Sequence, residues 1–391
     1  MQINNNFQKN ANMSMAARLL WRYPGISRID IAKKLGVYRS TISNIINALV
    51  ETGVVLESRK ENCSSLGGRK PLQLELNPDF GCVAGIELQP SGYTAVITDF
   101  TGVVRASRSG PLPEGSFEQL PVKIMEDLEA DIRSVGLAPL AVCMGLPGII
   151  DACGGTVIRS EIFNARNVAF PRNTAARFGV PFHIENEANC IAWYELLRNR
   201  EQECRSLICV NTEYTRDASR FSSCNGLAVG VGVALDGRVY GGSRFAAGEF
   251  VSYRWSGNMA GQGNFWVPPG DSRLGSPVLD GWIRELFESL VPVVSVFDPH
   301  AVIVHGELAR HRDDVQRVLE RDVPRFGDIL KRNDCGLVFS DGDPRSVAIG
   351  AAHMFLMRLF SLPVMDGIGH ECQNWDEVIS CARRAGMGAK N

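Results

Sequence analysis

No apolar run in this chain of 391 residues approaches the ~20 residues that a membrane-spanning helix needs. The first ten residues, MQINNNFQKN, lack the apolar core of a secretory signal. The 11 cysteines are scattered and form no CxxC pair, so neither a disulfide framework nor a zinc site of close spacing is indicated. With 21% charged and 45% hydrophobic residues, the composition excludes a disordered or fibrous chain. We therefore expect a cytoplasmic, globular protein of two or three domains.

Acidic residues are scarce at the start of the chain. Residues 1–75 hold 11 Lys and Arg against five Asp and Glu, although the net charge of the whole chain is −2. A basic segment attached to an acidic remainder indicates a module that faces nucleic acid.

The same segment predicts three short helices. Apolar side chains at helical spacing end at Pro24-Gly25. A second helix begins at a capping box, in which Ser27 accepts from the backbone and Asp30 reaches back, and it ends at Gly36. A third helix buries apolar positions within 42–49 at spacings of three and four. This order is typical of a helix-turn-helix.

The other face of the third helix is polar and contains no acidic residue. Its side chains have the length and hydrogen-bonding groups that reach phosphates and base edges. The candidate DNA contacts on this face are Tyr38, Arg39, Ser40, Thr41, Ser43, Asn44 and Asn47. The alternative is a protein-interaction module whose polar face is simply solvated.

A predicted hairpin follows the three helices. Val54–Leu56 reads as a strand, residues 58–71 as a basic loop, and alternating leucines at 72, 74 and 76 as the returning strand. Such a loop is a wing, and Arg69 and Lys70 suit contact with DNA phosphates. We expect a winged helix-turn-helix domain over residues 1–78.

The remainder alternates between strand and helix patterns and indicates an α/β fold with mixed sheets. It opens with three predicted strands separated by tight turns, and we expect two lobes around a cleft. The predicted strands are 82–88, 93–98, 103–108, 140–145, 182–184, 206–210, 228–235, 301–305 and 336–340, and the predicted helices are 116–134, 187–198, 279–297, 307–323, 345–360 and 375–385.

Several motifs in order resemble the ROK family of repressors, open reading frames and sugar kinases, and within it the regulators typified by xylose and N-acetylglucosamine repressors. The motifs that carry this resemblance are Gly67–Pro71, Gly85–Leu88, Gly145–Asp151, Glu185–Asn189, Gly230–Gly232, Ala246–Glu249 and Asp298-Pro299. The resemblance implies an actin-like (ribonuclease H-like) sugar-kinase fold over residues 79–391, with its second lobe at roughly 186–345. It also implies homodimers or homotetramers.

Residues on the ATP side depart from the pattern of the family. Glu187 stands where the family has its catalytic Asp, and the added methylene displaces the carboxylate by ~1 Å. The first phosphate loop reads Gln89-Pro90-Ser91 in place of Gly-Gly-Thr, and Pro90 has no N–H to donate to a phosphate. Leu227-Ala228 replace Thr-Gly in the second loop. We expect that kinase activity is lost.

The zinc ligands of the family are also replaced. Ser252 stands where a His is expected, and the chain has no Cys between Cys224 and Cys335. We expect neither a metal nor a cofactor. The aromatic residues Trp255, Phe265 and Trp266 read as core, with a platform that stacks on a sugar as the alternative.

The sugar side is better retained. By the resemblance, Asn164, Asn186, Glu187 and Glu249 match residues that bind sugar hydroxyls. Amide and carboxylate groups suit a polyol because each can satisfy several hydroxyls. The alternative for each is a helix cap or a hydrogen bond within the core.

Together these features predict a sequence-specific regulator, expected to repress genes of carbohydrate metabolism. Its expected partners are double-stranded operator DNA, a sugar or sugar derivative as effector, and a second copy of the chain, with no membrane contact. One alternative is an active ROK sugar kinase that carries a DNA-binding domain. A second is a scaffold or co-repressor whose cleft binds nothing.

Overall fold

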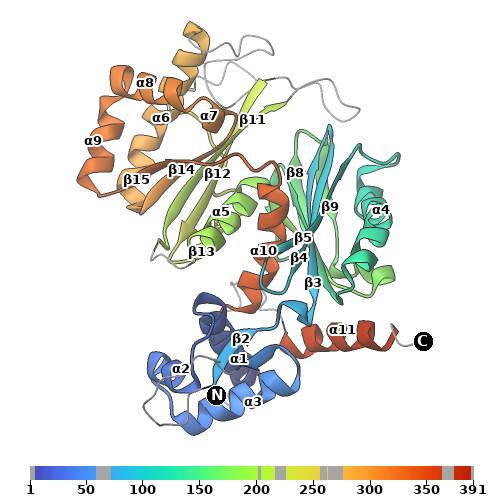
Figure 1. Ribbon diagram of the computed structural model, residues 1–391. Helices are drawn as coiled ribbons and strands as arrows, with labels where there is room; N and C mark the ends of the chain where they lie inside the picture. Colours follow the sequence, from blue (N-terminus) through green and yellow to red (C-terminus); the bar gives the residue numbers. More distant parts are fainter. Residues whose placement is uncertain are drawn as a thin grey trace.

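The computed structural model describes residues 5–58, 72–200, 204–215, 226–255, 262, 276–362 and 374–388. Figure 1 shows a small helical head below a body of two lobes, and each lobe is built on its own sheet. The expected alternation of strands and helices is confirmed in both lobes.

No helix within the described ranges is long and apolar enough to cross a membrane.

The head contains the three predicted helices and the two strands of the wing. Ser27 caps the second helix by accepting from the Asp30 backbone N–H, and Gly36 ends it in the left-handed conformation at φ 66°. The Asp30 carboxylate accepts from the Ser27 hydroxyl and not from its backbone, so the capping box is only half formed. The wing loop 59–71, with Arg69 and Lys70, lies outside the described residues. The elements are α1 (Asn5–Arg22), α2 (Arg28–Leu35), α3 (Arg39–Glu51), β1 (Val55–Ser58) and β2 (Gln73–Leu76), with β1 and β2 antiparallel.

The first lobe is a five-stranded sheet in the order β10-β6-β3-β4-β5. Strands β3, β4 and β5 form antiparallel pairs, whereas β6 and β10 are added in parallel. Helix α4 covers one face of this sheet and α10 the other (Figure 1). The elements are β3 (Cys82–Gln89), β4 (Gly92–Asp99), β5 (Val104–Gly110), α4 (Leu120–Val135), β6 (Pro139–Leu146), β10 (Phe182–Asn186) and α10 (Ser346–Leu359).

A small antiparallel sheet that the sequence did not predict is attached to this lobe. Its strands lie between β6 and β10 in the chain, and they are short and half-exposed, so their hydrophobic alternation is weak. They are β7 (Ile149–Asp151), β8 (Thr156–Ser160) and β9 (Ala165–Ala169), followed by the 3-10 helix η3 (Arg172–Phe178).

The second lobe has the strand order β13-β12-β11-β14-β15. The predicted single helix 307–323 is wrong: His311 leaves helical geometry at φ −109°, ψ 36° and divides it, and a further helix begins at Pro324. The elements are α5 (Glu187–Arg198), β11 (Leu207–Thr215), β12 (Gly226–Leu235), β13 (Arg238–Val239), α6 (Pro277–Phe297), β14 (Ala301–Gly306), α7 (Glu307–Arg310), α8 (Arg312–Asp322), α9 (Pro324–Arg332) and β15 (Gly336–Phe339).

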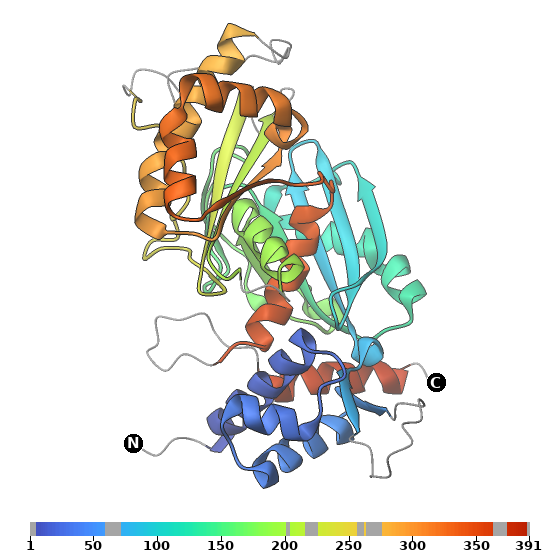
Figure 2. The same ribbon diagram turned by 60° about the vertical axis from the view of Figure 1, so that its left-hand side comes forward.

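Helices α5 and α10 pack against each other between the two sheets (Figure 2). Their approach depends on glycine, because a Cβ atom at Gly350 of α10 would lie 1.8 Å from the Cys190 carbonyl oxygen of α5. A Cβ at Gly85 of β3 would lie 2.0 Å from the carbonyl oxygen of Ala348. All 14 residues of α10 are buried, so this helix is the central element of the body.

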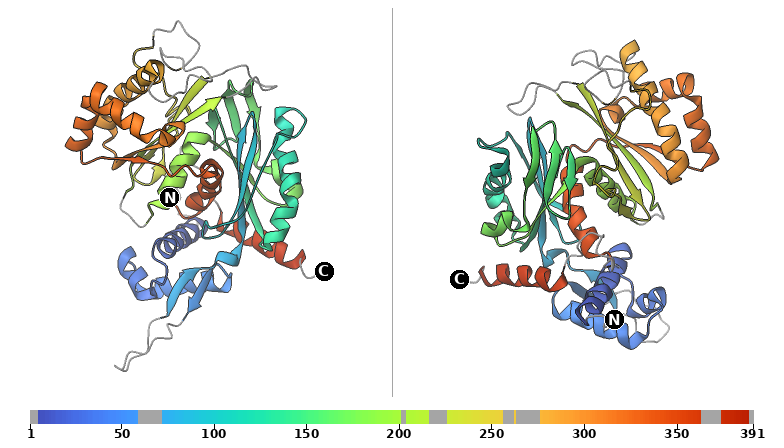
Figure 3. Two further views of the ribbon diagram at one scale, coloured as in Figure 1. Left: turned by 45° about the horizontal axis from the view of Figure 1, so that its top comes forward. Right: turned by 180° about the vertical axis from the view of Figure 1, so that it is seen from behind.

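The predicted last helix is confirmed as α11 (Trp375–Gly388), which lies along the base of the first lobe beside the head (Figure 3). Trp375 is fully buried and packs near Phe100 and Phe360. One apolar cluster therefore continues from the head, through these rings, into the first lobe. The domain division that we propose after residue 78 falls in a 3-10 turn, η1 (Pro78–Phe80), inside this shared core.

Candidate functional site

The candidate DNA surface lies on α3. Its apolar side chains Ile42, Ile46 and Leu49 are fully buried, which turns the polar side outward. Arg39, Ser40, Asn44 and Asn47 are exposed, Thr41 and Ser43 are half-buried, and Tyr38 is 85% exposed at the N-cap position. The structure thus brings all seven candidate residues of this helix to one surface.

A further residue on this surface, Arg28, was not predicted. It begins α2, and its Nη1 atom donates to the Asn47 Oδ1 atom at 2.8 Å. Its Nη2 atom lies 2.5 Å from the Glu57 Oε1 atom of β1. Arg28 thereby orients one candidate base-reading side chain. The only sequence signal was a basic residue directly after the capping Ser27.

A cavity of about 720 Å³ lies between the lobes. The β3–β4 hairpin of the first lobe, the ends of β11 and β14 in the second, and the start of α10 form its walls. Acidic side chains dominate among the charged groups of the lining, which are Glu87, Glu213, Glu307, Asp343 and Arg310. The replaced phosphate-loop residues Gln89 and Ser91 also line this cavity.

Gln89 bridges the lobes at one edge of this cavity. Its Nε2 atom donates to the Glu187 Oε2 atom at 2.8 Å and to the Glu213 Oε2 atom at 3.0 Å. Gln89 ends β3 in the first lobe, Glu187 begins α5, and Glu213 lies on β11 of the second lobe. A side chain that replaces a glycine of the family pattern therefore connects three elements through hydrogen bonds.

Burial dominates the electrostatics of these carboxyl groups. It raises the pKa of Glu187 to about 8, with the neighbouring Glu213 carboxylate as the next cause. Burial raises the pKa of Glu213 to about 7, although Arg310 opposes the shift. The pKa of Glu87 is also raised well above its ordinary value, by burial first and then by Glu213 and Glu187. The cluster therefore retains protons near neutral pH.

This cluster predicts that the free energy of unfolding decreases as the pH rises from about 4.5 to 8. In that range the folded protein holds protons on Glu187 that the unfolded chain has already released. We expect a fall in Tm of roughly 5 °C between pH 5 and pH 8.5, measured by calorimetry. Glu187→Gln should flatten this dependence, whereas Glu320→Gln on the exposed surface of α8 should leave it unchanged. An equally steep curve for Glu187→Gln would contradict the assignment.

The four candidate sugar residues lie on different elements. Asn186 caps α5, because its Oδ1 atom accepts from the Asn189 backbone N–H at 3.1 Å while its Nδ2 atom donates to the Gly148 carbonyl. Glu249 is exposed beside β12, and its charge contributes to the raised pKa of Glu187. Asn164 is exposed in the β8–β9 turn, where its backbone φ is 48°. The helix-cap alternative is thus realised for Asn186.

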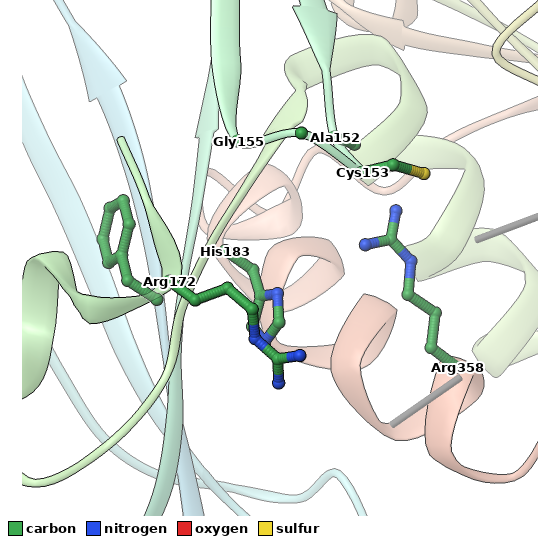
Figure 4. Close-up of a pocket in the computed structure, with 8 residues that line it drawn as sticks. Ala152, Cys153, Gly155, Arg172, His183 and Arg358 are labelled. Atoms are coloured by element: carbon green, nitrogen blue, oxygen red, sulfur yellow. The ribbon is translucent and has the colours of Figure 1, made fainter. Parts of the chain in front are cut away.

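A second pocket lies between the β7–β8 turn, the start of β10 and the last turn of α10. Figure 4 shows Arg358 of α10 directed toward Cys153 of the β7–β8 turn, with Arg172 and His183 facing the same space. Its volume of about 40 Å³ is too small for a sugar. Burial, followed by Arg358 and Arg172, lowers the pKa of His183 to about 3, so this imidazole is neutral.

Ser252 stands where the resemblance to the family implies a zinc-binding His. Ser252 is buried, and its hydroxyl accepts from the Arg254 backbone N–H. Across the described part of the chain, no three His, Cys, Asp or Glu side chains are grouped to hold a metal ion. The prediction that Trp255 belongs to the core is wrong, because this residue is 42% exposed. Phe265 and Trp266 lie outside the described ranges.

The fold defines a protein class: a winged-helix head on a two-lobed body of the sugar-kinase type. Residues 83–251 match the sequence model of the ROK family, and residues 18–55 match that of the winged helix-turn-helix DNA-binding domain. Residues 83–251 are thus similar to the ROK family, and the segment before them is similar to a winged helix-turn-helix domain. The expected fold class is confirmed.

Known relatives agree with this assignment. The chain is 29% identical over 248 residues to the putative xylose repressor of Caldicellulosiruptor sp. (strain Rt8B.4); the match covers 62% of this chain and 58% of that relative. It is 22% identical over 392 residues to the DNA-binding transcriptional dual regulator NagC of Escherichia coli K12, with 88% and 91% covered. A solved ROK family transcriptional regulator, a homologue of the E. coli MLC protein, superimposes with a TM-score of 0.70 at 16% identity, covering 96% of this chain and all of that one.

Proposed function

We propose that this protein is a transcriptional repressor that binds operator DNA through its head and a sugar or sugar derivative through its body. Relatives named as a xylose repressor and as the regulator NagC support this function. The proposed DNA contacts are Tyr38, Arg39, Ser40, Thr41, Ser43, Asn44, Asn47, Arg69 and Lys70, and the proposed sugar contacts are Asn164, Asn186, Glu187 and Glu249.

The observation that carries the proposal is the position of α10. Its first residues, Ser346 and Val347, line the cavity between the lobes. Its last residue, Leu359, accepts a hydrogen bond from the Ser14 hydroxyl of α1, and the Phe360 ring that follows packs against Trp21. One buried helix therefore reaches from the cavity to the DNA-binding head, which is the contact a sensor needs.

We infer that phosphotransfer is lost. The Gln89 side chain is engaged with two glutamates at the position of the phosphate loop, and Pro90 offers no N–H donor. ATP binding would have to break the hydrogen bonds of Gln89 and proceed without an N–H donor from Pro90.

An effector between the lobes would favour one degree of closure over another. It must bind the two states with different affinities, because otherwise no population shifts. In a homodimer, the change would alter the separation of the two α3 helices and so their fit to successive major grooves of a pseudo-palindromic operator.

Arg39→Ala should weaken operator binding roughly 10- to 100-fold, since one lost contact to a base or phosphate costs about 1–3 kcal/mol. Arg39 is exposed on the DNA side of α3, so the melting curve should not change. Arg332→Ala on α9 removes an equally exposed charge far from the head and serves as the matched control. The measurement is fluorescence anisotropy with an operator selected from genomic fragments; wild-type affinity in Arg39→Ala would place the DNA surface elsewhere.

A panel of sugars tests the sensor function. At a concentration of about 100 times its Kd, an effector should stabilise the protein by roughly 2.7 kcal/mol and raise its Tm. A coupled assay on the same protein should detect no hexose-dependent release of ADP. Turnover would instead support the active kinase, and a flat response to every sugar and sugar phosphate would support the scaffold.

A further inference from the structure

Five arginines lie along the contact between the head and the body. They are Arg18 and Arg22 on α1, Arg200 after α5, Arg205 before β11, and Arg238 on β13. Two of them flank the tight β12–β13 turn: a Cβ atom at Gly237 would lie 3.6 Å from the Arg18 Nη2 atom and 3.7 Å from the Arg205 Nε atom. In Figure 1 the dark blue α1 lies directly below the β13 end of that lobe. We call these five residues the arginine cluster.

None of the five forms an ion pair with a carboxylate of the described residues. Arg205 reaches only the Asp236 backbone oxygen, at 3.4 Å, and Arg200 lies 5.1 Å from the centre of the Trp21 ring. The Arg22 Nε atom is buried without a hydrogen-bond partner. Arginines elsewhere on this lobe differ, since Arg317 and Arg321 share the Asp280 carboxylate.

These like charges act on one another. The pKa of Arg18 is lowered, by burial first and then by the charges of Arg205, Arg238 and Arg22. Guanidinium groups this close repel one another, and no carboxylate among the described residues forms an ion pair with them to offset that repulsion. The repulsion would disappear if an anion with more than one charge lay between them.

The arginine cluster does not belong to the operator surface. On α1, Arg18 and Arg22 follow Ser14 at spacings of four and eight residues and so share its face. Ser14 and Trp21 on that face hydrogen-bond to the backbone oxygens of Leu359 and Thr101 in the body. The cluster therefore faces the body, whereas the polar side of α3 is exposed to solvent.

We propose that the arginine cluster binds a small, multiply charged anion, a phosphate-bearing metabolite, that bridges α1 of the head and the β12–β13 turn of the second lobe. Guanidinium groups match phosphate oxygens with paired N–H donors, and at least two such groups are available from each side. The bound anion would hold the head against the second lobe. Only its consequence for operator affinity rests on the proposed function; binding itself does not.

Binding is tested with pyrophosphate in a phosphate-free buffer at constant ionic strength, by calorimetric titration and by Tm. Arg205→Gln combined with Arg238→Gln removes two exposed members of the cluster, and Arg325→Gln combined with Arg332→Gln on α9 makes the same change of charge elsewhere. We expect pyrophosphate to raise the Tm of the wild type and of the control. The affinity of the Arg205/Arg238 variant for pyrophosphate should be roughly tenfold or more below that of the wild type. Without an anion, that variant should melt above the wild type because repulsion is relieved.

Three results would overturn the proposal. One is the absence of any pyrophosphate binding to the wild type at millimolar concentration. Another is an equal loss of affinity in both double variants, which would mean a general charge effect. The third combines two observations: the wild type binds no pyrophosphate, and DNA binding by the Arg205/Arg238 variant depends less on salt than DNA binding by the wild type. This result would make the cluster part of a nucleic-acid surface.

Discussion

Glu185→Gln should destabilise the protein by about 3–5 kcal/mol, because it leaves a buried guanidinium group without its counter-charge. The Arg358 Nη2 atom lies 3.0 Å from the Glu185 Oε2 atom, and both side chains are almost completely buried. The other carboxylate oxygen accepts from the Asn186 backbone N–H and the Asn189 amide, and glutamine can preserve both of these bonds. The expected loss of stability in Glu185→Gln therefore reports on the charge pair alone.

A double-mutant cycle separates the pair from its surroundings. Arg358→Met keeps most of the aliphatic volume, and the combination of Glu185→Gln with Arg358→Met removes both charges. We expect the double variant to be more stable than Glu185→Gln alone, since no unpaired charge remains. The free energies of unfolding are measured in urea. If the losses in free energy of unfolding of the two single variants simply add in the double variant, the two residues are not energetically coupled.

This ion pair also connects the candidate sugar motif to the head. Glu185 directly precedes Asn186 and Glu187, and Arg358 lies in the last turn of α10, next to the residues that contact α1. In Glu185→Gln, operator affinity should consequently respond less to the effector. That readout distinguishes a role in transmission from a role in stability alone.

Trp375→Ala is expected to have an effect of similar size, about 3–5 kcal/mol, because it empties a large cavity in the core shared by head and body. The ring is fully buried and lies 6.3 Å from that of Phe360, centre to centre. Its Nε1 atom donates to the Ser14 hydroxyl, which in turn donates to the Leu359 carbonyl oxygen. The substitution thus weakens the attachment of α1 to the body as well as the packing.

Trp375→Phe is the matched variant. It retains an aromatic ring and loses the indole N–H, so we expect a cost of about 1 kcal/mol. Thermal melting and protease sensitivity of the head are the measurements for both variants. Equal stability of Trp375→Ala and the wild type would mean that α11 does not hold the head in solution.

Local patterns in the sequence were sufficient to predict much of the fold. The spacing of Ile42, Ile46 and Leu49 predicted both α3 and its exposed polar side, since helix periodicity alone decides which face is buried. The continuous apolar runs of β3, β6 and β14 were similarly clear. By contrast, β7–β9 and the break at His311 lack a strong periodic signal, because short half-exposed strands and a local distortion depend on contacts with the rest of the body.

For the candidate site, the ordered motifs predicted a body that resembles the ROK family and an altered phosphate loop, since the residue types themselves carry that chemistry. Which groups meet depended on how distant segments pack. Gln89 bonds to Glu187 and Glu213, which follow 98 and 124 residues later. Arg28 bonds to Asn47, and Arg18 of α1 lies close to Arg205 and Arg238 of the second lobe. Charge pairing and burial are properties of these long-range contacts, so only the folded chain could show that the glutamates cluster and that no carboxylate in the described ranges pairs with the arginines.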